Sequence, residues 1–175
     1  MNRVTGYRSM VFAAALVAGL GASNAMAAGW YAGAGVGQAE YDGLSDEGTS
    51  MKLFLGYSLS PNAAVEFAYV DTGDGEEDTP FGDFTVSTDG FEISAVGFLP
   101  VNQSVSFLGR LGLYNWDAEA ELGGASGSDS GTDLTYGFGV QFDLSKAAAL
   151  RGEYQIYDID GDDIDNIGVS VLFRF

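Results

Sequence analysis

Acidic residues near the carboxyl end of the chain are spaced in a way that could bind a divalent cation. Asp158, Asp160 and Asp162 alternate along the sequence, as oxygen ligands do at the start of a calcium-binding loop. The rest of that pattern fails, because Asp163 stands where the loop requires glycine and Val169 where it requires a bidentate glutamate. These residues are weak metal-ligand candidates, and a solvated acidic loop is the favoured interpretation.

Enzyme chemistry is restricted by the residue types that the chain lacks. The sequence contains no histidine and no cysteine, which excludes Ser-His-acid triads, cysteine nucleophiles and imidazole-ligated metals. Glycines at G-x-G spacing occur in residues 29–37, but no helical pattern follows them, so they do not indicate a nucleotide-binding loop. We expect no enzymatic activity and no cofactor.

A second group of charged residues lies at alternating positions within otherwise apolar segments. Charges of both signs share one phase of this alternation: Lys52, Glu66, Glu92, Arg110, Asp143, Arg151, Glu153 and Arg174. If that phase faces an interior, the charges must pair, because an unpaired buried charge is costly. A satisfied polar core is the favoured interpretation, and a transport site is the alternative.

The elements that would position these charges are eight segments with the two-residue period of a β-strand. They are predicted at residues 30–41, 51–59, 63–72, 84–99, 104–119, 133–144, 148–156 and 167–175. Each approaches or exceeds the roughly 9 to 11 residues that a tilted strand needs to cross a bilayer, and an even number of strands closes a sheet without an exposed edge. The predicted fold is all-β, an eight-stranded antiparallel up-and-down transmembrane β-barrel. Its three short turns and both mature termini would be periplasmic, with four long, acidic loops outside the cell.

The final segment carries the clearest lipid-facing pattern. Val171, Phe173 and Phe175 lie in one phase, and the apolar alternation continues to the last residue. A soluble lipocalin-like barrel would place such apolar residues inside and the charges outside. The glycines concentrated in the charged phase and the terminal phenylalanine favour the membrane barrel.

The amino terminus has the features of a secretory signal peptide. Arg3 and Arg8 precede the apolar stretch 10–20, and the small-x-small triplet 25–27 is a cleavage site. The apolar stretch is shorter than the 20 or so residues of a membrane-spanning helix. We therefore predict a cleaved signal peptide at 1–27 and one barrel domain at 28–175.

The net charge of −18 restricts the partners. Removal of the signal peptide would make the charge more negative still. Nucleic acid and anionic surfaces are disfavoured because like charges repel, whereas cations are compatible with this surface.

Three stretches of the mature chain resemble the OmpA/OmpX-type family of eight-stranded outer-membrane barrels. They are WYAGAGVG at 30–37, RLGLYNW at 110–116 and RGEYQ at 151–155, and the closing strand resembles that of many outer-membrane barrels. The resemblance implies that the terminal residues Val171, Phe173 and Phe175 belong to the signal read by the barrel-insertion machinery. It also implies localisation in the outer membrane, reached by signal-peptide export through the inner membrane.

The resemblance further implies a lumenal Glu–Arg pair that gates a narrow channel. Glu66 and Arg151 match that pair, with Arg110 and Glu153 as neighbours. The family's alternative lysine partner falls near Val96, where this sequence departs from the pattern. No peptidoglycan-binding domain follows the eighth strand, so a cell-wall tether is not expected.

Three functional hypotheses follow from these patterns. The first is a non-enzymatic structural or surface-interacting barrel with a plugged lumen and acidic loops. The second is a narrow, weakly cation-preferring pore, and the third is an adhesin or divalent-cation binder that acts through its loops. Expected partners are outer-membrane lipid and lipopolysaccharide, the barrel-assembly machinery and periplasmic chaperones. We expect a monomer.

Overall fold

The computed structural model describes residues 29–41, 48–79, 82–122, 125–159 and 162–175, and it consists of eight strands. The strands are β1 (Gly29–Tyr41), β2 (Gly48–Ser60), β3 (Ala63–Thr79), β4 (Gly82–Pro100), β5 (Val105–Leu122), β6 (Ala125–Asp143), β7 (Ala148–Ile159) and β8 (Asp162–Arg174). The predicted signal peptide lies outside the described residues. No helix in these ranges is long and apolar enough to span a membrane.

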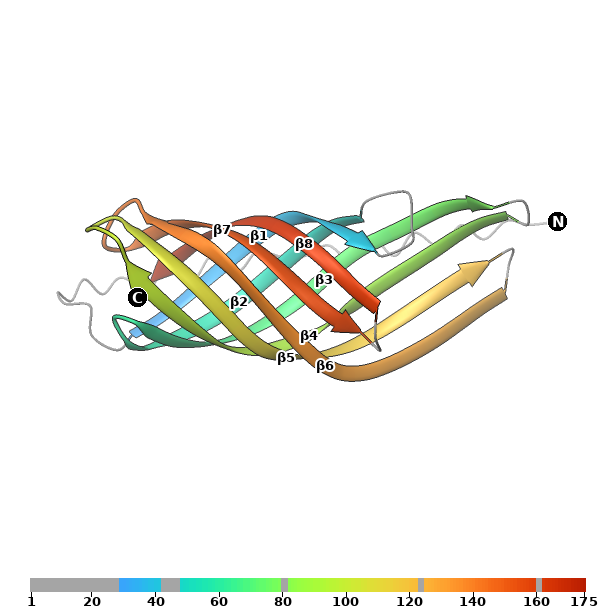
Figure 1. Cartoon of the computed structure of the whole chain (residues 1–175), viewed down its shortest axis with the longest axis horizontal. Coiled ribbons are helices and arrows are strands. Elements are labelled where there is room, and N and C mark those ends of the chain that lie inside the picture. The colour runs from blue at the N-terminus through green and yellow to red at the C-terminus, as the bar shows by residue number, and fades with distance from the viewer. Residues whose placement is uncertain (1–28, 42–47, 80–81, 123–124, 160–161) are drawn as a thin grey trace.

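The strands form one closed antiparallel barrel in which every strand pairs with its sequence neighbours (Figure 1). Closure is made by β1 and β8, whose register runs from Tyr31↔Arg174 to Tyr41↔Ile164. The amide of Phe175 donates to the carbonyl of Trp30 over 2.9 Å, which holds the last residue at this seam. The predicted all-β, eight-stranded barrel is therefore confirmed.

The outer wall of the barrel is apolar because the outward phase of each strand carries aliphatic and aromatic side chains. Leu99, Phe138 and Ile167 are each more than 60% exposed, although they are large and hydrophobic. Such a continuous apolar surface would be unfavourable in water and matches a hydrocarbon environment.

The inward phase fills the barrel, and glycine makes room for aromatic rings there. Gly56 lies under the ring of Tyr31, and Gly33 lies under the ring of Phe54. A Cβ atom at either glycine would overlap the ring. The glycines of the inward phase thus allow large side chains to cross a narrow interior.

The barrel rim opposite the short turns is uneven (Figure 1). The hairpins β3–β4 and β5–β6 extend beyond the ends of the other strands, and β4 pairs with β5 as far as Phe84↔Leu122. Together they form a four-stranded sheet that begins at the barrel rim and extends beyond it, which we call the protruding sheet: residues 70–79, 82–90, 114–122 and 125–134.

The protruding sheet corrects the predicted loops. The sequence prediction ended the third segment at residue 72 and began the sixth at residue 133. In the structure β3 continues to Thr79 and β6 begins at Ala125. The sequence pattern placed six acids in or beside the loop between the predicted segments 63–72 and 84–99. Their backbone lies in strands in the structure: Asp71, Asp74, Glu76, Glu77, Asp78 and Asp83. Gly, Asp and Ser are typical of loops, but cross-strand pairing from Asp74↔Ser87 to Thr79↔Gly82 overrides this local preference.

Candidate functional site: a charge network in the lumen

Six charged side chains meet inside the barrel, and each reaches the lumen because it lies in the inward phase of its strand. Five strands contribute, and β7 supplies two residues. The members of this lumenal network are Lys52 on β2, Glu66 on β3, Glu92 on β4, Arg110 on β5, and Arg151 and Glu153 on β7.

Arg110 is the centre of the lumenal network. Its guanidinium group contacts three carboxylates, those of Glu66 at 2.5 Å, Glu92 at 2.8 Å and Glu153 at 2.9 Å. It also donates to the hydroxyl of Ser94 over 2.8 Å. A guanidinium offers five N–H donors in a fixed plane, which explains how one side chain can bind carboxylates from three strands.

Glu66 is fully buried and is held by three donors. Besides Arg110, Arg151 donates to its second carboxylate oxygen over 2.6 Å, and the hydroxyl of Tyr31 donates to the same oxygen over 2.6 Å. The Glu66–Arg151 pair implied by the family resemblance is thus formed. It is one part of a larger cluster, because Glu66 binds Arg110 at the same time.

Arg151 is packed by aromatic rings as well as by polar groups. Its guanidinium carbon lies 5.3 Å from the centroid of the Phe54 ring, a distance that allows a cation–π interaction. Gln141 accepts two of its N–H groups over 3.0 and 3.2 Å. The side chain therefore has little freedom to move away from Glu66.

Lys52 closes the other side of the network. Its ammonium group lies 2.9 Å from Glu92 and donates to Gln155 over 2.8 Å. Gln155 in turn donates to Glu92 over 3.0 Å and to the hydroxyl of Thr135 over 2.7 Å. Three cations and three carboxylates give the network no net charge, as a dry interior requires.

A separate ion pair lies near the short turns. Arg174 and Asp143 are 2.6 Å apart, and about a quarter of each side chain is exposed. Lys146 is exposed in the turn between β6 and β7. The eight charges predicted to share the inward phase are therefore all paired, six in the lumenal network and two in this outlying pair.

Apolar and aromatic layers enclose the lumenal network on both sides. Towards the protruding sheet, the rings of Tyr114 and Tyr157 pack with their centroids 4.8 Å apart, and both residues are fully buried. Towards the short turns, Val96, Leu108 and Leu172 are each at most 5% exposed. Buried side chains thus lie on both sides of the lumenal network.

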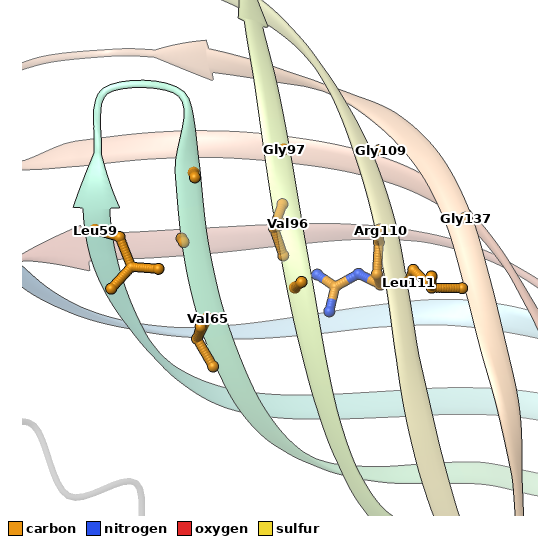
Figure 2. A pocket seen from close by; sticks show the side chains of 11 residues that line it. Leu59, Val65, Val96, Gly97, Gly109, Arg110, Leu111 and Gly137 are labelled. Carbon is orange, nitrogen blue, oxygen red and sulfur yellow. The ribbon is translucent and has the colours of Figure 1, made fainter.

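A hollow in the wall is lined mainly by apolar residues and glycines, and Arg110 is the one charged residue in its lining. Figure 2 shows it where Gly97 and Gly109 are directly paired on β4 and β5, with Leu59, Val65 and Leu111 around it. No atom lies within 4 Å of where a Cβ of either glycine would stand, so the hollow opens outward. Its outer side belongs to the apolar wall, and on its inner side it is lined by Arg110 of the lumenal network.

Two of the three weak metal-ligand candidates, Asp158 and Asp162, lie in strands. Asp158 lies on β7 opposite Asp163, and Asp162 begins β8 opposite Ile159, while Asp160 lies outside the described residues. Asp158 and Asp162 therefore belong to two paired strands, because the β7–β8 ladder extends further than the sequence prediction allowed. Among the residues that the structure describes, no three His, Cys, Asp or Glu side chains gather closely enough to hold a metal ion.

Uncharged side chains also belong to the site, and the pattern of charges alone did not predict them. Tyr31, Gln141 and Gln155 each hydrogen-bond to a network charge. All three lie in the inward phase, so the same alternation that located the charges could have located them. The alternation does not give the position of each side chain along the barrel axis, because that position depends on the stagger between strands.

A family model described as "Outer membrane protein beta-barrel domain" matches residues 10–175. The chain belongs to this family. It is accordingly an outer-membrane β-barrel of the OmpA/OmpX type, as the resemblance implied.

A curated relative agrees with this assignment. The chain is 26% identical over 170 residues to Outer membrane protein A of Yersinia pseudotuberculosis serotype I (strain IP32953). The match covers 83% of this chain and 48% of that protein, so the chain spans about half the length of this relative.

Solved structures share the fold at low sequence identity. Ail, the attachment invasion locus protein of Yersinia pestis, solved in complex with the heparin analogue sucrose octasulfate, is 20% identical with a TM-score of 0.60, and the match covers 85% of this chain and 97% of that chain. Neisserial surface protein A is 17% identical with a TM-score of 0.64 and the same coverages. The N-terminal barrel of Pseudomonas aeruginosa OprF is 13% identical with a TM-score of 0.63, covering 83% of this chain and 97% of that chain.

Proposed function

We propose that this outer-membrane barrel is a non-enzymatic scaffold with a plugged lumen, which presents an acidic surface outside the cell. The observation that carries the proposal is the lumenal network, in which Arg110 contacts three carboxylates and each carboxylate has at least one cationic partner. A conducting pore needs a hydrated path, and these side chains occupy the barrel interior with their polar groups already paired.

A narrow, weakly cation-preferring pore is the second candidate. The acidic residues of the protruding sheet favour it, because they would concentrate cations at the mouth. For ions to pass, the pairs that Arg110 and Arg151 make with Glu66 would have to open. Both arginines contact Glu66 at once, so moving one of them leaves the other in place.

The experiment that separates these candidates is single-channel recording in planar bilayers. We expect the refolded chain to give no discrete conductance steps at moderate voltage, although protease protection would show that it is inserted. Discrete cation-selective steps that change in Glu66→Ala would establish the pore instead. Glu153→Gln is a matched control, since it alters the edge of the network and leaves both arginine contacts of Glu66 in place.

The proposed acidic scaffold would interact with other molecules through its outer hairpins, which was the third functional hypothesis. Ail was solved with a heparin analogue, a highly anionic ligand. The outer hairpins of this chain, residues 70–90 and 114–134, contain acids and neither lysine nor arginine. We therefore propose that this surface rejects sulfated polysaccharides and that its partners are cationic.

The apolar outer wall supports the remaining partners that we propose. Lipid and lipopolysaccharide would surround the apolar band, and the assembly machinery and periplasmic chaperones would handle the chain before insertion. We propose that the inserted barrel is a monomer.

A further inference from the structure

The outer wall of the barrel has a gap in its cover of large side chains across β3, β4 and β5. Ala63 pairs with Gly97, and Gly97 pairs with Gly109, so three small residues lie side by side. Both glycines are exposed and belong to the outward phase, because they alternate with the buried side chains of Val96 and Leu108. A Cβ atom at either glycine would meet no other atom within 4 Å. The surface is therefore lower here than on the wall around it.

Large apolar side chains surround this gap and make it a hollow with a volume of about 500 Å³. Leu59 and Val65 lie on one side of it and Leu111 on the other (Figure 2). Towards the short turn between β4 and β5, the next outward pair is Leu99↔Phe107, and both side chains are more than half exposed. If the hollow were empty, its lining atoms would lack contacts on one side, so a hydrocarbon chain gains dispersion energy by entering it.

The surroundings of the hollow indicate what fills it. The hollow is continuous with the lipid-facing wall, on which the neighbouring side chains of Leu99, Leu111 and Phe138 are exposed. It therefore opens into the hydrocarbon layer and not into water. The apolar molecules present there at high concentration are lipid acyl chains.

The position of the hollow along the barrel indicates which leaflet supplies the chain. Gly97 lies close to Pro100, the last residue of β4, and Ala63 is the first residue of β3. At about 3.3 Å of rise per residue, the row of small residues is within roughly 10 Å of the short turns. Short turns face the periplasm in outer-membrane barrels, so the chain would come from the periplasmic leaflet.

The charge of the segments around the hollow indicates the headgroup. Neither residues 59–65 nor residues 97–109 contain an acidic or a basic residue. Arg110, the one charged residue in the lining, already contacts three carboxylates of the lumenal network. The chain as a whole carries a net charge of −18, which repels an anionic headgroup. A zwitterionic headgroup fits this uncharged rim.

We propose that the hollow at Gly97 and Gly109 binds one acyl chain of a zwitterionic phospholipid from the periplasmic leaflet. The acyl chain would lie over the two glycines, between Val65 and Leu111, and would cover the part of the wall behind which Arg110 lies. This inference goes beyond the general lipid contact proposed for the outer wall, which does not distinguish the hollow from the rest of that wall. It can therefore fail while the proposed scaffold stands.

The test uses phosphatidylcholine with a photoactivatable diazirine on one acyl chain, at low mole fraction in phosphatidylcholine vesicles that contain the full refolded chain. Mass spectrometry after irradiation locates the adducts. We expect adducts at Val65, Ala95 and Leu111 to be at least about fivefold more frequent than at Val171, an outward residue on β8. Equal labelling of the two walls would overturn the proposal. A phosphatidylglycerol probe with the same acyl chain should label the hollow less than phosphatidylcholine does, and equal or stronger labelling would also overturn it.

Variants of the chain test the hollow itself. Gly97→Leu places a side chain in the hollow and should reduce the adducts at Val65 and Leu111 at least about fivefold. Gly152→Leu is the matched control, since Gly152 is an exposed glycine on β7 with no atom within 4 Å of its Cβ position, and labelling should stay within about twofold. Circular dichroism of both variants should match the parent. Undiminished labelling in Gly97→Leu would overturn the proposal.

A second copy of the barrel is the other possible occupant of the hollow. Because the chain contains no cysteine, Gly109→Cys introduces a single thiol there. We expect no disulfide-linked dimer of this variant when the vesicles are oxidised mildly. A dimer would show that another barrel and not an acyl chain covers the hollow, which would overturn the proposal.

Discussion

Charged side chains are paired with opposite charges in the lumen, whereas on the protruding sheet they lie beside like charges. In the lumen, six charged groups from five strands combine into a neutral network, and every one of them has an ion-pair partner. On the protruding sheet, Asp71, Asp89 and Asp117 stand in one row on β3, β4 and β5, directly opposite one another. Like charges directly opposite are unfavourable, but water and salt reduce the cost outside the membrane.

This difference shows which charges the fold requires and which it only tolerates. A buried charge without a partner costs several kcal/mol, so the lumenal set is fixed in number and sign. An exposed row of like charges costs little folding free energy. The sign of the charges at such positions is therefore free to follow what the surface binds or repels. Three substitutions test this contrast, from the largest expected effect to the smallest.

Arg110→Met should have the largest effect, because it leaves three buried carboxylates with two cations. We expect the free energy of unfolding to fall by about 3–5 kcal/mol. Urea unfolding in phospholipid vesicles, followed by tryptophan fluorescence, measures the change. The control is Arg174→Met, which breaks a partly exposed pair and should cost less than about 1 kcal/mol. Similar losses in the two variants would contradict the distinction between buried and exposed pairs.

Tyr31→Phe should have an intermediate effect. It removes the hydroxyl that donates to Glu66 over 2.6 Å and keeps the ring that fills the space beside Gly56. Hydrogen bonds to charged groups contribute about 1.5–3 kcal/mol, so a loss in that range is expected from the same unfolding measurement. Tyr57→Phe on the outer wall is a matched control. A loss in Tyr31→Phe no larger than in this control would mean that the arginines alone satisfy Glu66.

Asp89→Asn should have the smallest effect and the opposite sign. It removes the middle charge of the row while keeping an oxygen that can accept from the hydroxyl of Tyr69, now 3.0 Å away. We expect a gain of a few tenths of a kcal/mol at low ionic strength, decreasing as salt screens the remaining pair. A gain that is independent of salt would show that repulsion across the row is not its cause.

The alternation of residue types was sufficient to predict the barrel and the inward charges. A period of two assigns each side chain to a face, and Glu66, Arg110 and Arg151, which it assigned to the inward phase, are buried in the structure. The period does not give the position of a side chain along the barrel axis. The simultaneous contact of Arg110 with three carboxylates could therefore not be predicted. That position is set by the stagger of the strands around the whole barrel, a property of the closed sheet and not of any one segment.

The ends of the strands were the least predictable part. Residues 125–132 are mainly glycine, serine and alanine, which individually favour turns, and they are strand here because β5 pairs with all of them. The alternating acids from Asp158 were assigned to a loop for the same reason, yet Asp158 pairs with Asp163 across two strands. Local composition misleads where a long hairpin supplies the missing hydrogen bonds.

The distribution of the lumenal network over the strands has a consequence for the order of assembly. Glu66 on β3 and Arg151 on β7 are on strands that are not neighbours, so their contact spans the interior. In an open sheet, before the barrel closes, these two groups are far apart. Each then carries an unpaired charge, which is costly in the hydrocarbon layer. An open sheet would therefore lack the ion pair between Glu66 and Arg151. Curling of the sheet into a closed barrel is the step that brings these two charges together and offsets the cost of burying them.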